Sequence, residues 1–194
     1  MRILVVAAMA ALSLRAETIT VYVQNDTRMA ASELRRAQSR AAEIFSSAQV
    51  GVEWRKGAPK PSVLRGVLED QRPIVVRIIS DISRSEHPGA LAFAQAYEGV
   101  HITILYERAR VCAPDRPEVI LAYVLVHEIT HMLQGISRHS RTGIMKANWS
   151  WADHYAMLRG GFLLCAEDIE LIHVGLAWRA SGKLIAGYQP PAIN

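Results

Sequence analysis

One pentapeptide constrains this chain more than any other feature. Residues 127–131 read His-Glu-Ile-Thr-His, inside an apolar run that covers residues 119–133 and predicts a helix. Residues four apart on a helix lie one turn above each other, so His127 and His131 can reach one metal ion from the same face. Glu128 lies about 100° around the helix axis from His127, where its carboxylate can reach a water molecule on that metal without binding the metal itself.

The ends of this helix are also marked in the sequence. Asp115 and Glu118 are three residues apart, with Pro117 in the first turn, which is typical of a helix start. Gly135 follows Gln134 and can adopt the left-handed conformation that ends helices. We therefore expect a helix from about Asp115 to Gln134.

Elsewhere the hydrophobic pattern mixes strand and helix periods. Residues 73–80 are apolar on both faces apart from Arg77, which predicts a central strand covered on both sides. We expect an irregular stretch after Gly135. The other expected elements are strands at 17–23, 50–54, 90–97 and 100–106, the last two joined by a turn at Glu98-Gly99, and helices at about 29–48 and 166–180.

The two histidines leave a catalytic zinc ion one protein ligand short. His139 is the best candidate for the third ligand, because a chain that breaks at Gly135 can turn back toward the helix. Asp153, His154 and Glu167 remain alternatives.

The motif and the residues after it resemble the metzincin clan of zinc peptidases. The clan signature joins a HExxH helix, a glycine, a third histidine and a methionine-containing turn, which correspond here to residues 127–131, Gly135, His139 and Met145. The spacing differs, because this chain reads HExxHxxxGxxxH. The glycine and the third histidine follow the first by eight and twelve residues instead of the usual seven and ten, and Ser137 occupies the tenth position.

The resemblance covers most of residues 17–180. Residues 89–94 (GALAFA) are similar to the edge strand of the clan, and residues 164–169 (LCAEDI) to the start of the closing helix of a matrix metallopeptidase. A minimal catalytic domain of that kind implies an α+β, zincin-like fold. Its mixed, mostly parallel, twisted sheet would have about five strands and an antiparallel edge strand, with a backing helix, an active-site helix and a C-terminal helix.

The resemblance also implies a function. The chain would be a secreted, zinc-dependent endopeptidase acting on peptide or protein substrates, which would pair with the edge strand around residues 91–94. Zinc would polarise the scissile carbonyl, and Glu128 would act as general base toward the attacking water. The implied site consists of His127, His131 and His139 as zinc ligands, Glu128 as base and Met145 beneath the metal.

The same fold permits other functions. A secreted zinc-binding protein without catalysis and a zinc hydrolase acting on a non-peptide bond are the alternatives, although an intact Glu128 favours catalysis. Trp149, Trp151 and Tyr155 follow the methionine turn, and we expect them either to wall a side-chain pocket or to belong to the core.

The N-terminus resembles a secretory signal. Arg2 precedes an uncharged run at 3–14 and then Arg15 and Ala16, a pattern too short to span a bilayer. We expect cleavage after Ala16, with Ala8-Met9-Ala10 as a rival site, and a location outside the cytoplasm, either secreted or periplasmic. Residues 17–194 would form one domain with a single core and no lasting membrane insertion.

Charge and cysteine content add two expectations. Loss of residues 1–16 would lower the formal charge from +4 to +2, and the remaining basic residues are scattered, so we expect no nucleic-acid partner and a monomer. Cys112 and Cys165 are a candidate disulfide in an exported chain, with two unpaired thiols as the alternative.

Overall fold

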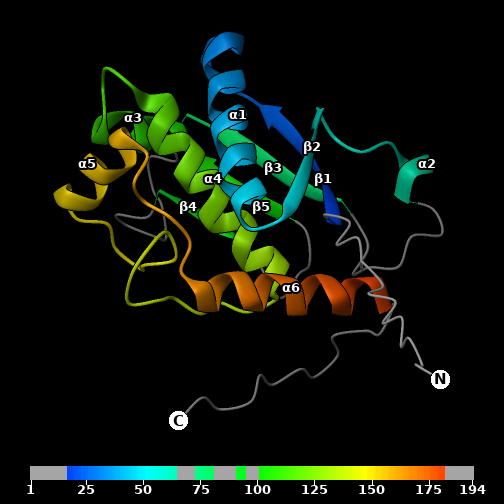
Figure 1. Cartoon of the computed structure of the whole chain (residues 1–194). Coiled ribbons are helices and arrows are strands. Elements are labelled where there is room, and N and C mark those ends of the chain that lie inside the picture. The colour runs from blue at the N-terminus through cyan, green and yellow to red at the C-terminus, as the bar shows by residue number, and fades with distance from the viewer. Residues whose placement is uncertain (1–16, 65–72, 81–90, 95–100, 182–194) are drawn as a thin grey trace, which may run out of the picture.

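The computed structural model describes residues 17–64, 73–80, 91–94 and 101–181, in which helices lie against a single twisted sheet (Figure 1). The predicted signal at residues 1–16 and the predicted turn at Glu98-Gly99 lie outside this part of the chain. The sheet has the strand order β2-β1-β3-β5-β4. Its strands are β1 (Glu17–Asn25), β2 (Val50–Lys56), β3 (Ile74–Ile79), β4 (Ala92–Ala94) and β5 (His101–Leu105).

The sheet is mixed. Strands β2, β1, β3 and β5 are parallel to one another, and β4 pairs antiparallel with β5 at the edge, with Ala92 opposite Ile104. The predicted α+β fold class is confirmed. Parallel strands require a crossover between them, and α1 supplies the one from β1 to β2.

The central strand β3 is covered more fully on one side than on the other. Ile74, Val76 and Ile78 are buried, whereas Val75 and Ile79 are half-buried and Arg77 is exposed. The expectation of a strand covered on both sides is therefore wrong. Val75 and Ile79 have strand propensity whichever face they occupy, so an apolar run alone does not reveal two-sided burial.

Helices α1 and α4 pack against each other in front of the sheet, and α6 crosses below α4 (Figure 1). Ala37, Ala41 and Phe45 form the buried stripe of α1, and their spacing of four residues places them on one face. The helices are α1 (Ala31–Ser47), α2 (Pro61–Leu64), α3 (Tyr106–Cys112), α4 (Pro117–Gln134), α5 (Trp151–Arg159) and α6 (Ala166–Ser181). Among them, no helix is both long and apolar enough to cross a membrane.

The predicted end of α4 and the predicted proline in its first turn are confirmed, whereas the expected cap at Asp115 is wrong. Gly135 ends the helix with φ 67°, and its N–H donates to the carbonyl of His131 at 2.9 Å. At the other end Pro117 is the first helical residue and Arg116 precedes it without a side-chain cap. Proline suits this position because its missing N–H would have no partner in the first turn, so Asp115 is not needed as a cap.

Helix α5 lies within the stretch that we expected to be irregular, so that expectation is wrong for residues 151–159 and confirmed for the residues on either side. Ser150 and Asp153 form a capping box, in which each side chain accepts a hydrogen bond from the backbone N–H of the other residue. Gly160 ends the helix with φ 80°. Both signals are present in the sequence, but the helix is only 9 residues long and its apolar period is weak.

Helix α6 approaches the end of α4 very closely. A Cβ atom at Gly175 would lie 1.8 Å from the carbonyl oxygen of Leu133, so a residue with a side chain would push the two helices apart. Cys165 directly precedes α6 and Cys112 ends α3, and both are free thiols. Of the two alternatives, the disulfide is therefore wrong and the unpaired thiols are confirmed.

Candidate metal centre

Helix α4 carries its polar residues into the interior of the protein. Every residue of this helix except Glu118 is buried, because the helix contacts the sheet and helices α1, α3, α5 and α6. Polar side chains in such surroundings raise the free energy of the folded state unless they find partners. His127, Glu128 and His131 are therefore the residues whose partners decide what the site can do.

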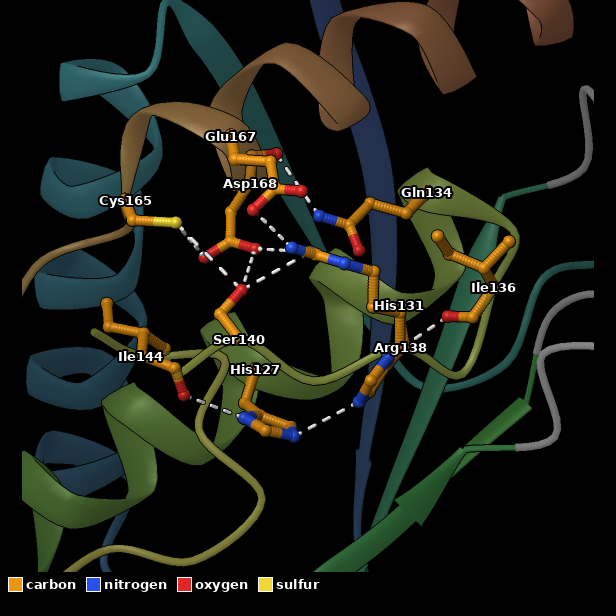
Figure 2. A network of polar contacts seen from close by, with 10 residues as sticks. All are labelled: His127, His131, Gln134, Ile136, Arg138, Ser140, Ile144, Cys165, Glu167 and Asp168. Carbon is orange, nitrogen blue, oxygen red and sulfur yellow. Dashed lines mark hydrogen bonds and ion pairs between the residues drawn. The ribbon is translucent and has the colours of Figure 1, made fainter. Parts of the chain in front are cut away.

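The imidazoles of His127 and His131 are each held by a backbone carbonyl (Figure 2). Nδ1 of His127 lies 2.8 Å from the oxygen of Ile144, and Nδ1 of His131 lies 3.1 Å from the oxygen of Ile136. A carbonyl only accepts hydrogen bonds, so the proton of each ring is on Nδ1 and Nε2 keeps a free lone pair. This is the usual arrangement of metal-binding histidines.

The two Nε2 atoms are 3.1 Å apart. Neither atom has a proton to donate in the tautomers that the carbonyls select, so two lone pairs face each other. Two nitrogen ligands of a tetrahedral zinc ion are roughly 3.3 Å apart, given zinc–nitrogen bonds of about 2.0–2.1 Å. The pair thus already has the separation that a shared cation requires.

The structure brings His139 to this pair. Its ring centroid lies 5.3 Å from that of His127 and 4.9 Å from that of His131. One possible ligand atom from each of the three residues lies within 4.8 Å of the others, and His139 is the exposed member of the group. Three imidazoles suit zinc among the common biological metals, and an exposed side leaves room for water and substrate.

The alternative third ligands have other partners. Asp153 forms an ion pair with Lys146 besides its contacts at the start of α5. Glu167 forms an ion pair with Arg138, and the ring of His154, on α5, lies edge-on to that of Trp151 at 5.9 Å. Within the described ranges, the group of residues able to hold a metal contains none of these three.

Burial sets the protonation of the histidine pair. It lowers the pKa of His127 and that of His131 to about 4 each, against an ordinary value of 6.5. Both imidazoles are therefore neutral at pH 7 and offer lone pairs to a metal. Burial also lowers the pKa of His139.

Burial acts in the opposite direction on Glu128. Its side chain is 8% exposed, and loss of hydration raises its pKa from 4.5 to about 7. A carboxyl group with such a pKa can both accept and release a proton near neutral pH, as a general base must.

The methionine turn, residues 143–145, holds the carbonyl that orients His127. Gly143 has φ 73°, and a Cβ atom there would lie 2.5 Å from the carbonyl oxygen of Leu163, so the turn requires glycine. The N–H of Ile144 donates to the same oxygen at 3.0 Å, which holds the Ile144 carbonyl toward His127. Met145 is fully buried.

Of the three aromatic residues after the turn, only Trp149 lies at the centre. Its indole N–H donates to the Ile144 carbonyl at 3.0 Å, and its ring lies edge-on to His127 at 5.6 Å. Trp151 and Tyr155 are 81% and 61% exposed on α5, so the core assignment is wrong for both. The sequence did not reveal the roles of Ile136 and Ile144, because a backbone carbonyl leaves no signature in residue type.

Known structures share this architecture. No protein-family model and no curated protein matches the chain. The archaemetzincin of Methanopyrus kandleri superposes with a TM-score of 0.59 at 16% identity over 86% of this chain and 99% of that one. The archaemetzincin of Archaeoglobus fulgidus, solved with malonate, superposes with a TM-score of 0.52 at 14% identity over 79% of this chain and 99% of that one.

The chain has the archaemetzincin fold. At this level of identity the likeness concerns the fold alone. The archaemetzincin fold confirms the zincin-like class predicted from the sequence, and the nearer resemblance to a matrix metallopeptidase stays a prediction.

The raised pKa of Glu128 predicts how the stability of the metal-free protein depends on pH. The folded state binds the proton of Glu128 more tightly than the unfolded state does. The free energy of unfolding therefore falls as the pH rises and this carboxyl group ionises. Replacement by Gln removes that penalty. We expect E128Q to gain about 1–3 kcal/mol of unfolding free energy relative to wild type as the pH rises from about 4.5 through 7. Urea unfolding with a chelator measures this difference, and a difference independent of pH would contradict the assignment.

Proposed function

We propose that this chain is a zinc metallopeptidase in which His127, His131 and His139 bind one zinc ion and Glu128 is the general base. The observation that carries the proposal is the convergence of three imidazole nitrogens within 4.8 Å, two of them on rings held by carbonyls. The archaemetzincin fold supports it independently.

Zinc bound there would supply a Lewis acid that polarises the scissile carbonyl and acidifies a water molecule. Glu128, one residue from the first ligand, would take the proton of that water and return it to the leaving amine. Because its pKa is near 7, the carboxyl group gives up the proton as readily as it accepts it.

The substrate would bind along β4. This strand is at the edge of the sheet, pairs on one side with β5 and contacts α4. An extended peptide that adds to its free side by main-chain hydrogen bonds would run beside the active-site helix. Such pairing favours cleavage within a chain, hence an endopeptidase, and a peptide or protein as substrate.

We expect Glu128→Ala to lower peptide hydrolysis by roughly 10²- to 10⁴-fold while zinc stays bound, because only the general base is lost. Cleavage of a diverse peptide mixture by wild type, with and without a chelator, gives the reference. Glu118→Gln, on the first turn of the same helix, is the matched control and should retain activity. Full hydrolysis by zinc-loaded E128A would exclude the assigned role, and the absence of chelator-sensitive cleavage by wild type would favour a non-catalytic or non-peptide function.

A second prediction concerns the third ligand. His139→Ala should weaken zinc binding by more than the roughly 10- to 100-fold that loss of a residue supporting a ligand costs, because a bond to the metal itself disappears. Equilibrium titration of the metal-free protein measures it. His154→Ala serves as control. Unchanged affinity in H139A together with a loss in H154A would transfer the role to His154.

The export of the protein is part of the proposal. Its support is the charged, apolar and small-residue pattern of residues 1–16, which would make residues 17–194 the mature, monomeric enzyme outside the cytoplasm. We expect N-terminal sequencing of the exported protein to begin at Glu17. An intact Met1 on protein recovered from the cytoplasm would contradict export.

A further inference from the structure

The carboxylate of Asp168, at the start of α6, is fully buried and yet receives several hydrogen bonds (Figure 2). Nη1 of Arg138 and Oγ of Ser140 donate to its Oδ1 at 3.2 and 2.5 Å, and Sγ of Cys165 donates to its Oδ2 at 2.9 Å. A carboxylate without water destabilises the folded state unless such partners stay in place. These hydrogen bonds therefore fix the positions of the donor side chains as well as that of the Asp168 carboxylate.

Two of these donors are the immediate neighbours of His139 in the chain. The side chains of Arg138 and Ser140 point to Asp168, while the ring of His139 faces His127 and His131. Side chains that alternate between two sides are typical of extended chain. Bonds made on one side of this segment consequently set the direction of the imidazole on the other.

His139 depends on this support more than the other two histidines do. The rings of His127 and His131 are buried in α4 and bonded to carbonyls, whereas His139 is exposed on an irregular segment. Within the part of the chain that the structure describes, the imidazole of His139 contacts the rings of His127 and His131 but forms no hydrogen bond.

We propose that Asp168 is a positioning residue for His139: by holding Arg138 and Ser140, it keeps this third imidazole directed at the metal position. The inference rests on the proposed zinc site. The same residue is also joined to α4, because the side-chain amide of Gln134 donates to the backbone carbonyl of Asp168 at 3.1 Å. One turn of α6 thus sets the end of the active-site helix and the segment with the third ligand relative to each other.

The experiment measures zinc affinity by titration of the metal-free protein. Asp168→Asn removes the buried charge that holds Arg138 and Ser140, while the ion pair of Arg138 with the more exposed Glu167 remains, and should weaken binding roughly 10- to 100-fold, as loss of a residue behind a ligand does. Glu170→Gln removes the same charge from an exposed position on α6 and should leave the affinity unchanged. Ser140→Ala removes a single hydroxyl and should also weaken zinc binding, but by less than D168N does. If D168N does not fold, the affinity of S140A tests the inference.

The decisive comparison repeats these measurements in the His139→Ala background. If Asp168 acts through His139, then D168N/H139A binds zinc as H139A does, and S140A/H139A likewise. An equal loss in both backgrounds would show that the buried charge acts on the cation directly and would overturn the inference, as would wild-type affinity in both D168N and S140A.

The same titration separates this inference from the function on which it rests. A wild-type protein that binds no zinc contradicts the proposed metallopeptidase, and the positioning role with it. A wild-type protein that binds zinc, beside D168N and S140A variants that bind it equally well, contradicts the positioning role alone.

Discussion

The hydrogen bonds that hold the imidazoles of His127 and His131 to backbone carbonyls are the interactions on which the rest of the site depends. Two neutral imidazoles inside an apolar helix destabilise the fold unless their polar atoms are satisfied. The carbonyls of Ile144 and Ile136 satisfy one nitrogen of each ring and thereby direct the other nitrogen to a common point. The segment after Gly135 must therefore return to α4, because it carries both carbonyls and the third histidine.

Helix α6 and the residues just before it explain how that segment is held. Gly175 lets α6 approach the carbonyl of Leu133, so the start of α6 lies beside the end of α4. Asp168 then lies within hydrogen-bond distance of the residues on either side of His139. The carbonyl of Leu163 accepts a hydrogen bond from the N–H of Ile144 in the methionine turn. The exposed imidazole is placed by its buried neighbours, which leaves its own face open to solvent.

Much of the fold was readable from local pattern. The period of the apolar residues in α1 and the glycine at the end of α4 predict their elements directly, because helix geometry relates spacing to burial. The unequal burial of the two faces of β3 and the presence of helix α5 escaped that reasoning. A strand of Val and Ile has the same sequence pattern whether one face is covered or two. The capping box of Ser150 and Asp153 did not suffice to predict α5, because the apolar period of this helix is weak.

By itself the sequence predicted the histidine pair at residues 127 and 131, the carboxylate of Glu128 beside it and the place where the helix stops, since each depends on residues within one or two turns. Tertiary structure decided which of four candidates joins the pair. It also left both cysteines as free thiols and placed Asp168 within hydrogen-bond distance of the residues on either side of His139. The contacts of Asp168 join residues 28 to 34 apart in the chain, and residue spacing carries no information on such contacts until the helices have packed.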